Sequence, residues 1–251
     1  MRDALGLCLT TPVIPTVGYE SLKARFAEGL DVGAAGLCQE IFRFLRRGEY
    51  VELVFLAYRW RLPCRIDERL EEKRRRLDLM LLKAALSYAR RGIPVFPCQP
   101  GGKRPLTYSG FWDATTDARR IKAWRGQWPS ANIGVPTGEK SGLLVLDIDS
   151  RGGGPESLAI LEGQNGPLPD TARSRTGGGG VHAFFRYPTE EEVRNSAGWL
   201  GPGLDVRGEG GYVVVPPSST QRAYEWIDRS PLAEAVWLLK CLSENDEKTL
   251  F

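Results

Sequence analysis

Apolar residues in the first third of the chain recur at mixed spacings of three and four, a pattern typical of helices that bury one face. Glycine and proline separate these segments, and Gly92 is a natural stop for the last of them. The pattern predicts helices at 19–30, 35–47, 50–61 and 66–91. The basic run Lys73 to Arg76 is interpreted as a solvated helix face, with contact to a phosphate backbone as the alternative.

After residue 92 the apolar residues gather in short runs bounded by turn-forming residues, which predicts strands. The predicted strands are 93–98, 132–136, 143–149, 181–187 and 223–227, with 204–207 and 211–216 as a closing pair. Helices are expected at 117–128, capped by Thr116 or Asp117, and at 155–162, 190–196 and 232–242. Helices interspersed with strands indicate an α+β or α/β core.

The strand predicted at 143–149 ends in two carboxylates, Asp147 and Asp149, separated by Ile148. Side chains alternate between the two faces of a strand, so both acids are expected on one face. Neighbouring anions repel each other and are costly to bury, and a divalent cation such as Mg²⁺ would remove that cost. Because the Asp-x-Asp pattern is short, a strand that ends at the surface with both acids solvated is the alternative.

The composition narrows the class of protein. Of the 251 residues, 42% are hydrophobic and 26% are charged, as in soluble globular chains, and the net charge of +3 permits a nucleic-acid partner without requiring one. The five cysteines form no Cys-x-x-Cys pair, so we expect no disulfide framework, no zinc knuckle and a cytoplasmic location. No apolar run is long enough to span a membrane, and no secretion leader is recognised.

The only histidine, His182, follows four consecutive glycines, Gly177 to Gly180. Such a run costs backbone entropy and is tolerated best where the backbone approaches another group closely. Its N–H groups could surround phosphate oxygens, and His182 could donate to a phosphate, accept a proton or bind a metal. A mobile linker before a strand is the alternative.

Asp205 resembles Asp147, since it also lies on a short apolar strand, and a third acid could complete a two-metal site for phosphoryl or nucleotidyl transfer. A turn residue capping a hairpin is the alternative for Asp205. Four cations lie in glycine-rich surroundings near these strands and suit a triphosphate or a template, although each alone is more simply a surface charge. They are Lys103, Arg104, Arg175 and Arg207.

The segment 134–141 looks like a phosphate-binding P-loop but departs from it in two ways. Glu139 stands where the motif requires glycine, and Lys140 and Ser141 precede a strand instead of opening a helix. We therefore exclude the ATPase chemistry of P-loop proteins.

Six motifs occur in a fixed order over roughly residues 81–228, and the last is the longest and most distinctive. They are Gly102-Lys103-Arg104-Pro105, Asn132-Ile133-Gly134-Val135, Asp147-Ile148-Asp149, Gly179-Gly180-Val181-His182, Leu204-Asp205-Val206-Arg207-Gly208 and Gly210-Gly211-Tyr212-Val213-Val214-Val215-Pro216-Pro217-Ser218. Together they resemble the archaeo-eukaryotic primase superfamily. The closest resemblance is to the bifunctional DNA primase/polymerase (prim-pol) domain of plasmids, phages and other mobile elements.

The resemblance implies an α+β fold, with an RRM-like catalytic palm beside a small α/β unit. It implies template-directed transfer from an NTP or dNTP to a 3′-hydroxyl or to an initiating nucleotide, on single-stranded DNA. By matching position, Asp147, Asp149 and Asp205 would hold Mg²⁺ or Mn²⁺, and His182 would contact the phosphates of the nucleotide. Further candidates for nucleotide binding are Lys103, Arg175, Gly179, Gly180 and Arg207.

The resemblance also divides the chain into an N-terminal helical domain (1–80), a prim-pol core (81–230) and a C-terminal helix (231–251). Some relatives carry a zinc-binding stem between the histidine and the last aspartate. Residues 183–204 contain no cysteine and no histidine, so we expect no zinc here. Larger relatives continue into a helicase, which makes a replicative helicase a further candidate partner.

Three alternative functions remain open from the residues. A metal-dependent nuclease and an Asp-x-Asp glycosyltransferase would also use acids to hold Mg²⁺ or Mn²⁺. A non-catalytic module that binds single strands would instead need exposed aromatic side chains on its sheet. Phe184, Phe185 and Tyr212 are the candidates for that role, although burial in the core explains them more simply.

Overall fold

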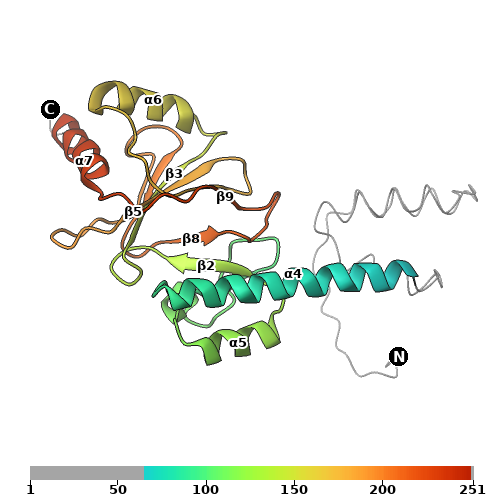
Figure 1. Ribbon diagram of the computed structural model, residues 1–251. Helices are drawn as coiled ribbons and strands as arrows, with labels where there is room; N and C mark the ends of the chain where they lie inside the picture. The colour runs from blue at the N-terminus through green and yellow to red at the C-terminus, as the bar shows by residue number, and fades with distance from the viewer. Residues whose placement is uncertain (1–64, 250–251) are drawn as a thin grey trace, which may run out of the picture. The chain divides into compact units, whose positions relative to one another are not determined.

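The computed structural model describes residues 65–249 (Figure 1). The helices predicted at 19–30, 35–47 and 50–61 lie outside the described residues. The described helices are α4 (Arg65–Arg90), the 3₁₀ helix η1 (Gly110–Asp113), α5 (Ala118–Gln127), α6 (Gly154–Asn165) and α7 (Val236–Thr249). The strands are β1 (Phe96–Cys98), β2 (Asn132–Pro136), β3 (Leu143–Ile148), β4 (Arg173–Arg175), β5 (Val181–Arg186), β6 (Ser196–Ala197), β7 (Leu204–Arg207), β8 (Tyr212–Val215) and β9 (Glu225–Asp228).

The structure confirms the helices expected at 66–91 and 117–128. Helix α4 ends just before Gly92, whose φ of 80° suits a residue without a Cβ. Helix α5 is capped by Asp117, whose side chain accepts the N–H of Arg119 at 2.8 Å. Because α4 crosses residues 80 and 81 without a break, the division of the chain at that point stays a prediction.

The strands form two antiparallel sheets, so the described part of the chain has a mixed α+β fold. The small sheet has the order β1-β2-β8, and the large sheet has the order β6-β7-β3-β5-β4-β9. The strands predicted at 204–207 and 211–216 are confirmed, but they do not pair with each other, because β7 pairs with β3 and β8 pairs with β2. The connection between them crosses from one sheet to the other, and Gly211 accepts the N–H of Thr137 there.

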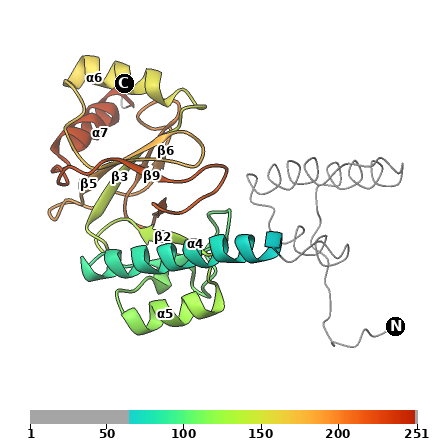
Figure 2. The same ribbon diagram turned by 45° about the vertical axis from the view of Figure 1, so that its right-hand side comes forward.

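Alternation along β3 gives the large sheet two faces. Leu144, Leu146 and Ile148 point to one face, where α6 and α7 cover them (Figures 1 and 2). Leu143 and Val145 point to the other face and pack with residues of α4, α5 and the small sheet. The large sheet is therefore buried on both sides along most of β3. Asp147, near the end of β3, lies on the same face as Leu143 and Val145.

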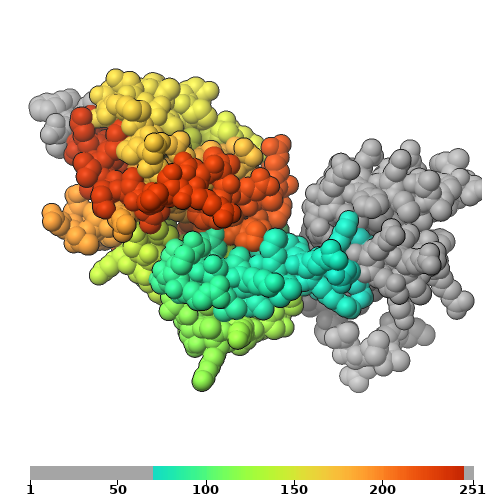
Figure 3. Space-filling view, viewed as in Figure 1, coloured from blue at the N-terminus to red at the C-terminus, as the bar shows by residue number. Residues whose placement is uncertain are grey.

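Helix α4 lies directly against the strands at the C-terminal end of the fold, although the two are far apart in the sequence (Figure 3). The hydroxyl of Tyr88 donates to the carbonyl oxygen of Pro216 at 2.7 Å, and both groups are buried. Burial raises the pKa of Tyr88 to about 12, so the phenol stays protonated and keeps this hydrogen bond at neutral pH. This contact connects α4 to the end of β8.

The helix predicted at 190–196 is wrong, because the segment is extended and ends in β6. The N–H of Val193 donates to the hydroxyl of Tyr187 at 2.9 Å, and its carbonyl accepts the N–H of Glu209 at 2.7 Å. These tertiary bonds satisfy backbone groups that a helix would have paired internally, so they override the local helix propensity. The pattern also failed to indicate β4, a three-residue strand that forms only as the partner of β5 and β9.

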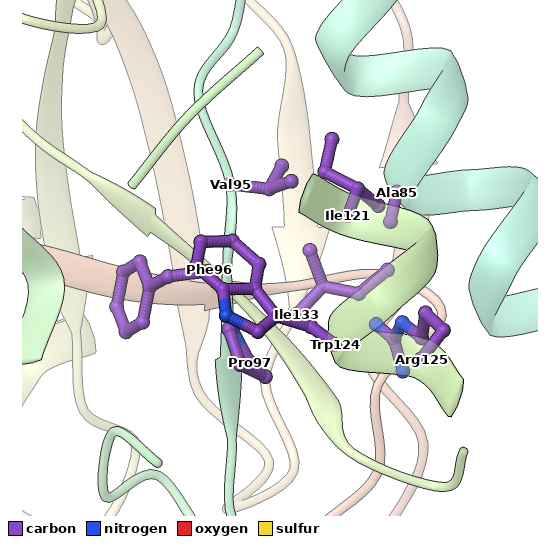
Figure 4. A pocket seen from close by; sticks show the side chains of 8 residues that line it. All are labelled: Ala85, Val95, Phe96, Pro97, Ile121, Trp124, Arg125 and Ile133. Carbon is purple, nitrogen blue, oxygen red and sulfur yellow. The ribbon is translucent and has the colours of Figure 1, made fainter. Parts of the chain in front are cut away.

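The packing between α4, α5 and the small sheet leaves a gap of only about 10 Å³ (Figure 4). Its lining includes Ala85 of α4, Ile121 and Arg125 of α5, and Ile133 of β2. Such a gap is at the lower limit for a single water molecule. Among residues 65–249, no helix combines the length and the hydrophobicity that crossing a membrane would require.

Candidate active site

A row of four polar residues crosses the large sheet on the face that carries Leu143 and Val145. Asp147 of β3 lies opposite Asp205 of β7 on one side and opposite His182 of β5 on the other. His182 in turn lies opposite Ser174 of β4. Residues directly opposite each other in an antiparallel pair share a face, with Cβ atoms about 5 Å apart. The register alone therefore brings three of the predicted site residues together.

Asp147 is at the centre of the row and has a cation or a proton donor on each side. Its Oδ1 is 3.4 Å from Nε2 of His182, and its Oδ2 is 3.7 Å from Nη2 of Arg207. The side chain of Asp147 is 20% exposed, whereas that of His182 is only 4% exposed. Asp147 thus connects a buried imidazole to a partly open surface.

The pKa of Asp147 reflects two opposing effects. Burial alone would raise it, since desolvation disfavours the anion. The neighbouring His182, followed by the charges of Arg207 and Lys103, outweighs burial and holds the pKa of Asp147 below its ordinary value of 3.8. Asp147 is therefore an anion at neutral pH, as a metal ligand or an orienting acceptor must be.

Asp205 is held by two donors. Its Oδ2 accepts Nη2 of Arg207 at 2.7 Å, and its Oδ1 accepts the backbone N–H of Gly198 at 3.0 Å. A charge-assisted bond of this length is among the stronger hydrogen bonds in proteins. Arg207 therefore lies between the carboxylates of Asp205 and Asp147 and balances part of their combined charge.

The row opens into a hollow of about 260 Å³ between the two sheets. Three of the predicted cations and acids line it together with glycines, aromatic residues and part of β8. The lining residues are Lys103, Phe111, Asp147, His182, Asn195, Arg207, Gly210, Gly211, Tyr212, Val213, Val214 and Tyr224. The hollow thus combines one carboxylate, one imidazole and two cations, which is a suitable environment for a phosphorylated ligand.

The loop that carries Lys103 is fixed by a buried amide. The Nδ2 of Asn132 donates to the carbonyl oxygens of Gly102 at 2.8 Å and Ser219 at 2.7 Å, and its Oδ1 accepts the N–H of Ser219 at 2.9 Å. Asn132 is only 3% exposed. Its three hydrogen bonds join the lysine loop to the segment after β8, which explains the asparagine in the second motif physically.

Asp149 lies one residue beyond β3 and does not line the hollow. Its Oδ1 accepts the N–H of Arg151 at 2.9 Å, and its carbonyl oxygen accepts the N–H of Gly154 at 3.0 Å, at the start of α6. Within residues 65–249 no group of three or more His, Cys, Asp or Glu side chains is arranged to hold a metal ion. The register therefore places Asp147 opposite Asp205, and the role of Asp149 as a metal ligand stays a prediction.

The four glycines before His182 form the tight turn of the β4–β5 hairpin. The N–H of Thr176 donates to the carbonyl of Gly180 at 2.8 Å, and the N–H of Gly179 donates to the carbonyl of Thr176 at 2.9 Å. A Cβ on Gly180 would lie 2.4 Å from the carbonyl oxygen of Ile148, so the close approach of β5 to β3 requires glycine there. Packing thus accounts for Gly180, and a phosphate is not needed to explain it.

Arg175 is placed away from the row. It is adjacent to Ser174 on β4, so its side chain alternates to the opposite face of the large sheet. Its Nη1 lies 3.7 Å from Oε2 of Glu225, the residue opposite it on β9. Of the four predicted cations, Lys103 and Arg207 line the hollow, whereas Arg104 and Arg175 do not.

Four polar or aromatic lining residues were not predicted as active-site residues: Phe111, Asn195, Tyr212 and Tyr224. Tyr212 belongs to the last motif and was considered in the sequence only for stacking on bases. The predicted helix at 190–196 concealed Asn195, whose Oδ1 accepts the N–H of Gly208 at 3.0 Å. Phe111 and Tyr224 occur in segments without a motif, so only the tertiary structure could reveal them.

The aromatic residues considered for a single-strand-binding sheet are largely in the core. Phe184 is 2% exposed and Phe185 is fully buried, on opposite faces of β5. Buried rings cannot stack on bases. Phe184 and Phe185 therefore cannot form the base-stacking surface that a non-catalytic single-strand-binding module would need.

Comparison with known protein families gives one match. The model of a family described as "Bifunctional DNA primase/polymerase, N-terminal" matches residues 85–237, which is more than half of the chain. A comparison with curated proteins found no match. The matched range includes every residue of the row and every residue that lines the hollow.

Proposed function

The chain belongs to the bifunctional DNA primase/polymerase family, and from this premise we propose that it transfers nucleotides from an NTP or dNTP to a 3′-hydroxyl or an initiating nucleotide, directed by single-stranded DNA. The observation that carries the proposal is the row Asp205, Asp147 and His182 at the edge of the hollow. These groups suit a reaction in which charge on phosphate oxygens must be balanced.

We infer further that the large sheet is the RRM-like palm of this enzyme. The strands β7-β3-β5-β4 are neighbours in that order, and α6 connects β3 to β4. A β-α-β-β unit followed by a further strand at the other side of the first strand gives the same order, as in ferredoxin-like folds. This order supports the assignment and explains why the acid on the central strand has partners on both sides.

The carboxylates fit a divalent cation. Asp147 and Asp205 face the same side of the large sheet, and carboxylate oxygens are the ligands that Mg²⁺ and Mn²⁺ prefer. One or two carboxylates with substrate phosphates are a common magnesium site, so the pair suffices without Asp149. When bound, such a cation would lower the pKa of the attacking hydroxyl and neutralise charge on the triphosphate. Asp147 and Asp205 would hold it, and Asp149 is the candidate third ligand.

The other residues of the hollow bind and orient the nucleotide. Lys103 and Arg207 are the cations that meet the triphosphate, and Asn132 keeps the loop of Lys103 in place. His182 has its Nε2 beside Asp147, while its Nδ1 has no hydrogen-bond partner among the described residues. We assign this second nitrogen to the nucleotide, because an unpaired buried polar group is costly unless a ligand completes it.

The test is synthesis of labelled product on single-stranded DNA with Mg²⁺ or Mn²⁺, with and without an annealed primer, analysed on a denaturing gel. Product without a primer would establish a primase-polymerase, and product only with a primer would establish a polymerase. Asp147→Ala should give no product in either case. Nucleotide-independent degradation of the labelled DNA would instead establish a nuclease and contradict the proposal.

The same assay tests the role of Asp149. Asp149→Asn keeps the oxygen that accepts the N–H of Arg151, so it removes the charge with little effect on the turn. If Asp149 is a ligand, this variant should lose synthesis as Asp147→Ala does. Full activity in Asp149→Asn would limit the metal site to Asp147 and Asp205.

A further inference from the structure

Two large aromatic side chains project into solvent on the connection between β1 and α5. Tyr108 is fully exposed, with a relative exposure of 104%, and the side chain of Trp112 is 60% exposed. A single exposed aromatic residue requires no explanation. Two of them within five residues, on the same segment as Phe111 of the hollow's lining, form a distinct surface.

A third ring connects this surface to the hollow. The ring centroid of Phe111 is 4.6 Å from that of Trp112 and 5.6 Å from that of Tyr212, and its plane is inclined by only 30° to the Tyr212 ring. Phe111 and Tyr212 both line the hollow. The rings of Trp112, Phe111 and Tyr212 thus run from solvent to the candidate active site.

The backbone that presents these rings is fixed before any ligand arrives. The hydroxyl of Thr107 donates to the carbonyl of Gly110 at 2.6 Å, and the N–H of Ser109 donates to Oδ2 of Asp113 at 2.9 Å. The Oδ1 of Asp113 in turn accepts Nη2 of Arg120 on α5 at 3.0 Å. A rigid aromatic surface loses little conformational entropy on binding, which favours a role in recognition.

Cations accompany the rings. The Nζ of Lys140 donates to the carbonyl oxygen of Trp112 at 2.6 Å, which leaves two ammonium protons for a ligand. Lys103 lines the same hollow as Phe111. Exposed rings next to a basic groove are the combination with which proteins bind single-stranded nucleic acid without reading its sequence.

We propose that Tyr108 and Trp112 form a stacking platform for unpaired bases of the template strand, which leads that strand to the hollow. The inference rests on the proposed function and adds a binding surface to it. Base–aromatic stacking is sequence-tolerant, so the platform holds any template. Lys140 would contact the phosphate of the stacked nucleotide.

The test measures binding of a fluorescently labelled single-stranded DNA of mixed sequence to the full chain by anisotropy. Trp112→Ala and Tyr108→Ala should each weaken binding roughly 5- to 100-fold, and Trp112→Phe should restore most of it. Because no phosphate contact is lost, the slope of log Kd against log salt should stay that of the unaltered chain. Lys140→Ala should instead reduce this slope.

Trp199→Ala is the matched control, since Trp199 is 42% exposed and does not line the hollow. It should leave the affinity unchanged. Equal affinities for the unaltered chain, Trp112→Ala and Tyr108→Ala would overturn the platform and assign the rings to another partner, such as a protein. Equal losses for Trp199→Ala and Trp112→Ala would overturn it as well.

The outcome is separable from that of the proposed function. Asp147→Ala should bind the single strand with unaltered affinity and fail in synthesis. Intact synthesis together with unchanged binding in Trp112→Ala would overturn the platform alone. Absence of synthesis in the unaltered chain, with the predicted loss of binding in Trp112→Ala, would contradict the polymerase and keep the platform.

Discussion

Arg125 and Asp147 are both charged side chains held largely away from solvent, yet their surroundings differ. The guanidinium of Arg125 donates to the backbone carbonyls of Pro129 and Ala131, and the gap beside it is about 10 Å³. Burial lowers the pKa of Arg125 to about 10, so it is still a cation at neutral pH. These hydrogen bonds and the tight packing indicate that Arg125 stabilises the contact of α5 with the small sheet.

Asp147 differs from Arg125 because open space and an unpartnered polar atom lie next to it. It borders a hollow of about 260 Å³, and His182 beside it has a buried nitrogen without a partner among the described residues. A buried charge that is fully packed and hydrogen-bonded serves the stability of the fold. A charge that borders an open hollow, next to a polar atom without a hydrogen-bond partner, can bind a ligand. The two sites therefore predict opposite outcomes when each charge is removed.

The largest expected effect is the loss of synthesis in Asp147→Asn. The substitution is isosteric and removes the charge that a metal or an orienting contact needs, so the rate should fall by at least about 10²- to 10³-fold. Arg207 keeps its 2.7 Å bond to Asp205, so losing the Asp147 anion should lower the urea concentration at which the chain unfolds only slightly. Nucleotide incorporation and urea unfolding, measured on the same preparation, check both parts. A rate within tenfold of the unaltered chain would remove Asp147 from the mechanism.

Arg125→Met should show the reverse behaviour. Methionine fills much of the same volume, but the carbonyls of Pro129 and Ala131 lose their donor, which should lower the free energy of unfolding by about 2–4 kcal/mol. The protein that remains folded should synthesise at the normal rate, because Arg125 does not line the hollow. If Arg125→Met lost synthesis but kept its stability, the assignment of a structural role to Arg125 would be wrong.

The sequence could predict the individual pieces of the site better than their arrangement. Asp147, His182, Asp205 and Arg207 lie on strands that short apolar runs reveal, and alternation of side chains fixes which of them share a face. The partner of each strand could not be predicted in the same way. Pairing of β7 with β3 and of β8 with β2 joins segments about 60 to 80 residues apart, and a local pattern carries no such information.

Where a prediction failed, tertiary contacts had replaced a local preference. Residues 190–196 are extended because Tyr187 and Glu209 take the backbone bonds of Val193. The burial of Arg125 on α5 likewise depends on its contacts with two loop carbonyls, which a local sequence pattern does not indicate. For Asp149, which lies one residue beyond β3 and accepts the N–H of Arg151, the role of metal ligand stays a prediction.

The third prediction compares two glycines of the β4–β5 turn. In Gly180→Ala the new Cβ would meet the carbonyl oxygen of Ile148 at 2.4 Å, so β5 must shift from β3, at a cost of about 1–3 kcal/mol in the free energy of unfolding. In Gly178→Ala the nearest atom, Oγ1 of Thr176, is 3.9 Å away, so stability should change by less than about 1 kcal/mol.

Thermal or urea unfolding of the two glycine variants gives the stability difference, and the KM for the nucleotide gives the functional one. Displacement of β5 also moves His182, so KM should rise in Gly180→Ala but not in Gly178→Ala. A raised KM in Gly178→Ala at normal stability would contradict the packing explanation. That result would instead indicate that the backbone N–H groups of the glycine turn bind phosphate oxygens.

The smallest expected effect is the dependence of stability on acid pH. The pKa of Asp147 in the folded chain lies below its ordinary value of 3.8, so its contribution to stability is fully present above pH 3.8 and is lost as the pH falls through the folded value. The titratable and charged groups that face it are His182, Arg207, Lys103 and Asp205. In EDTA, the difference in unfolding free energy between the unaltered chain and Asp147→Asn should therefore shrink as the pH falls below 3.8. Arg125→Met should retain the acid slope of the unaltered chain, because a guanidinium does not titrate there. Parallel pH profiles for the unaltered chain and Asp147→Asn would show that the neighbours of Asp147 do not stabilise its anion.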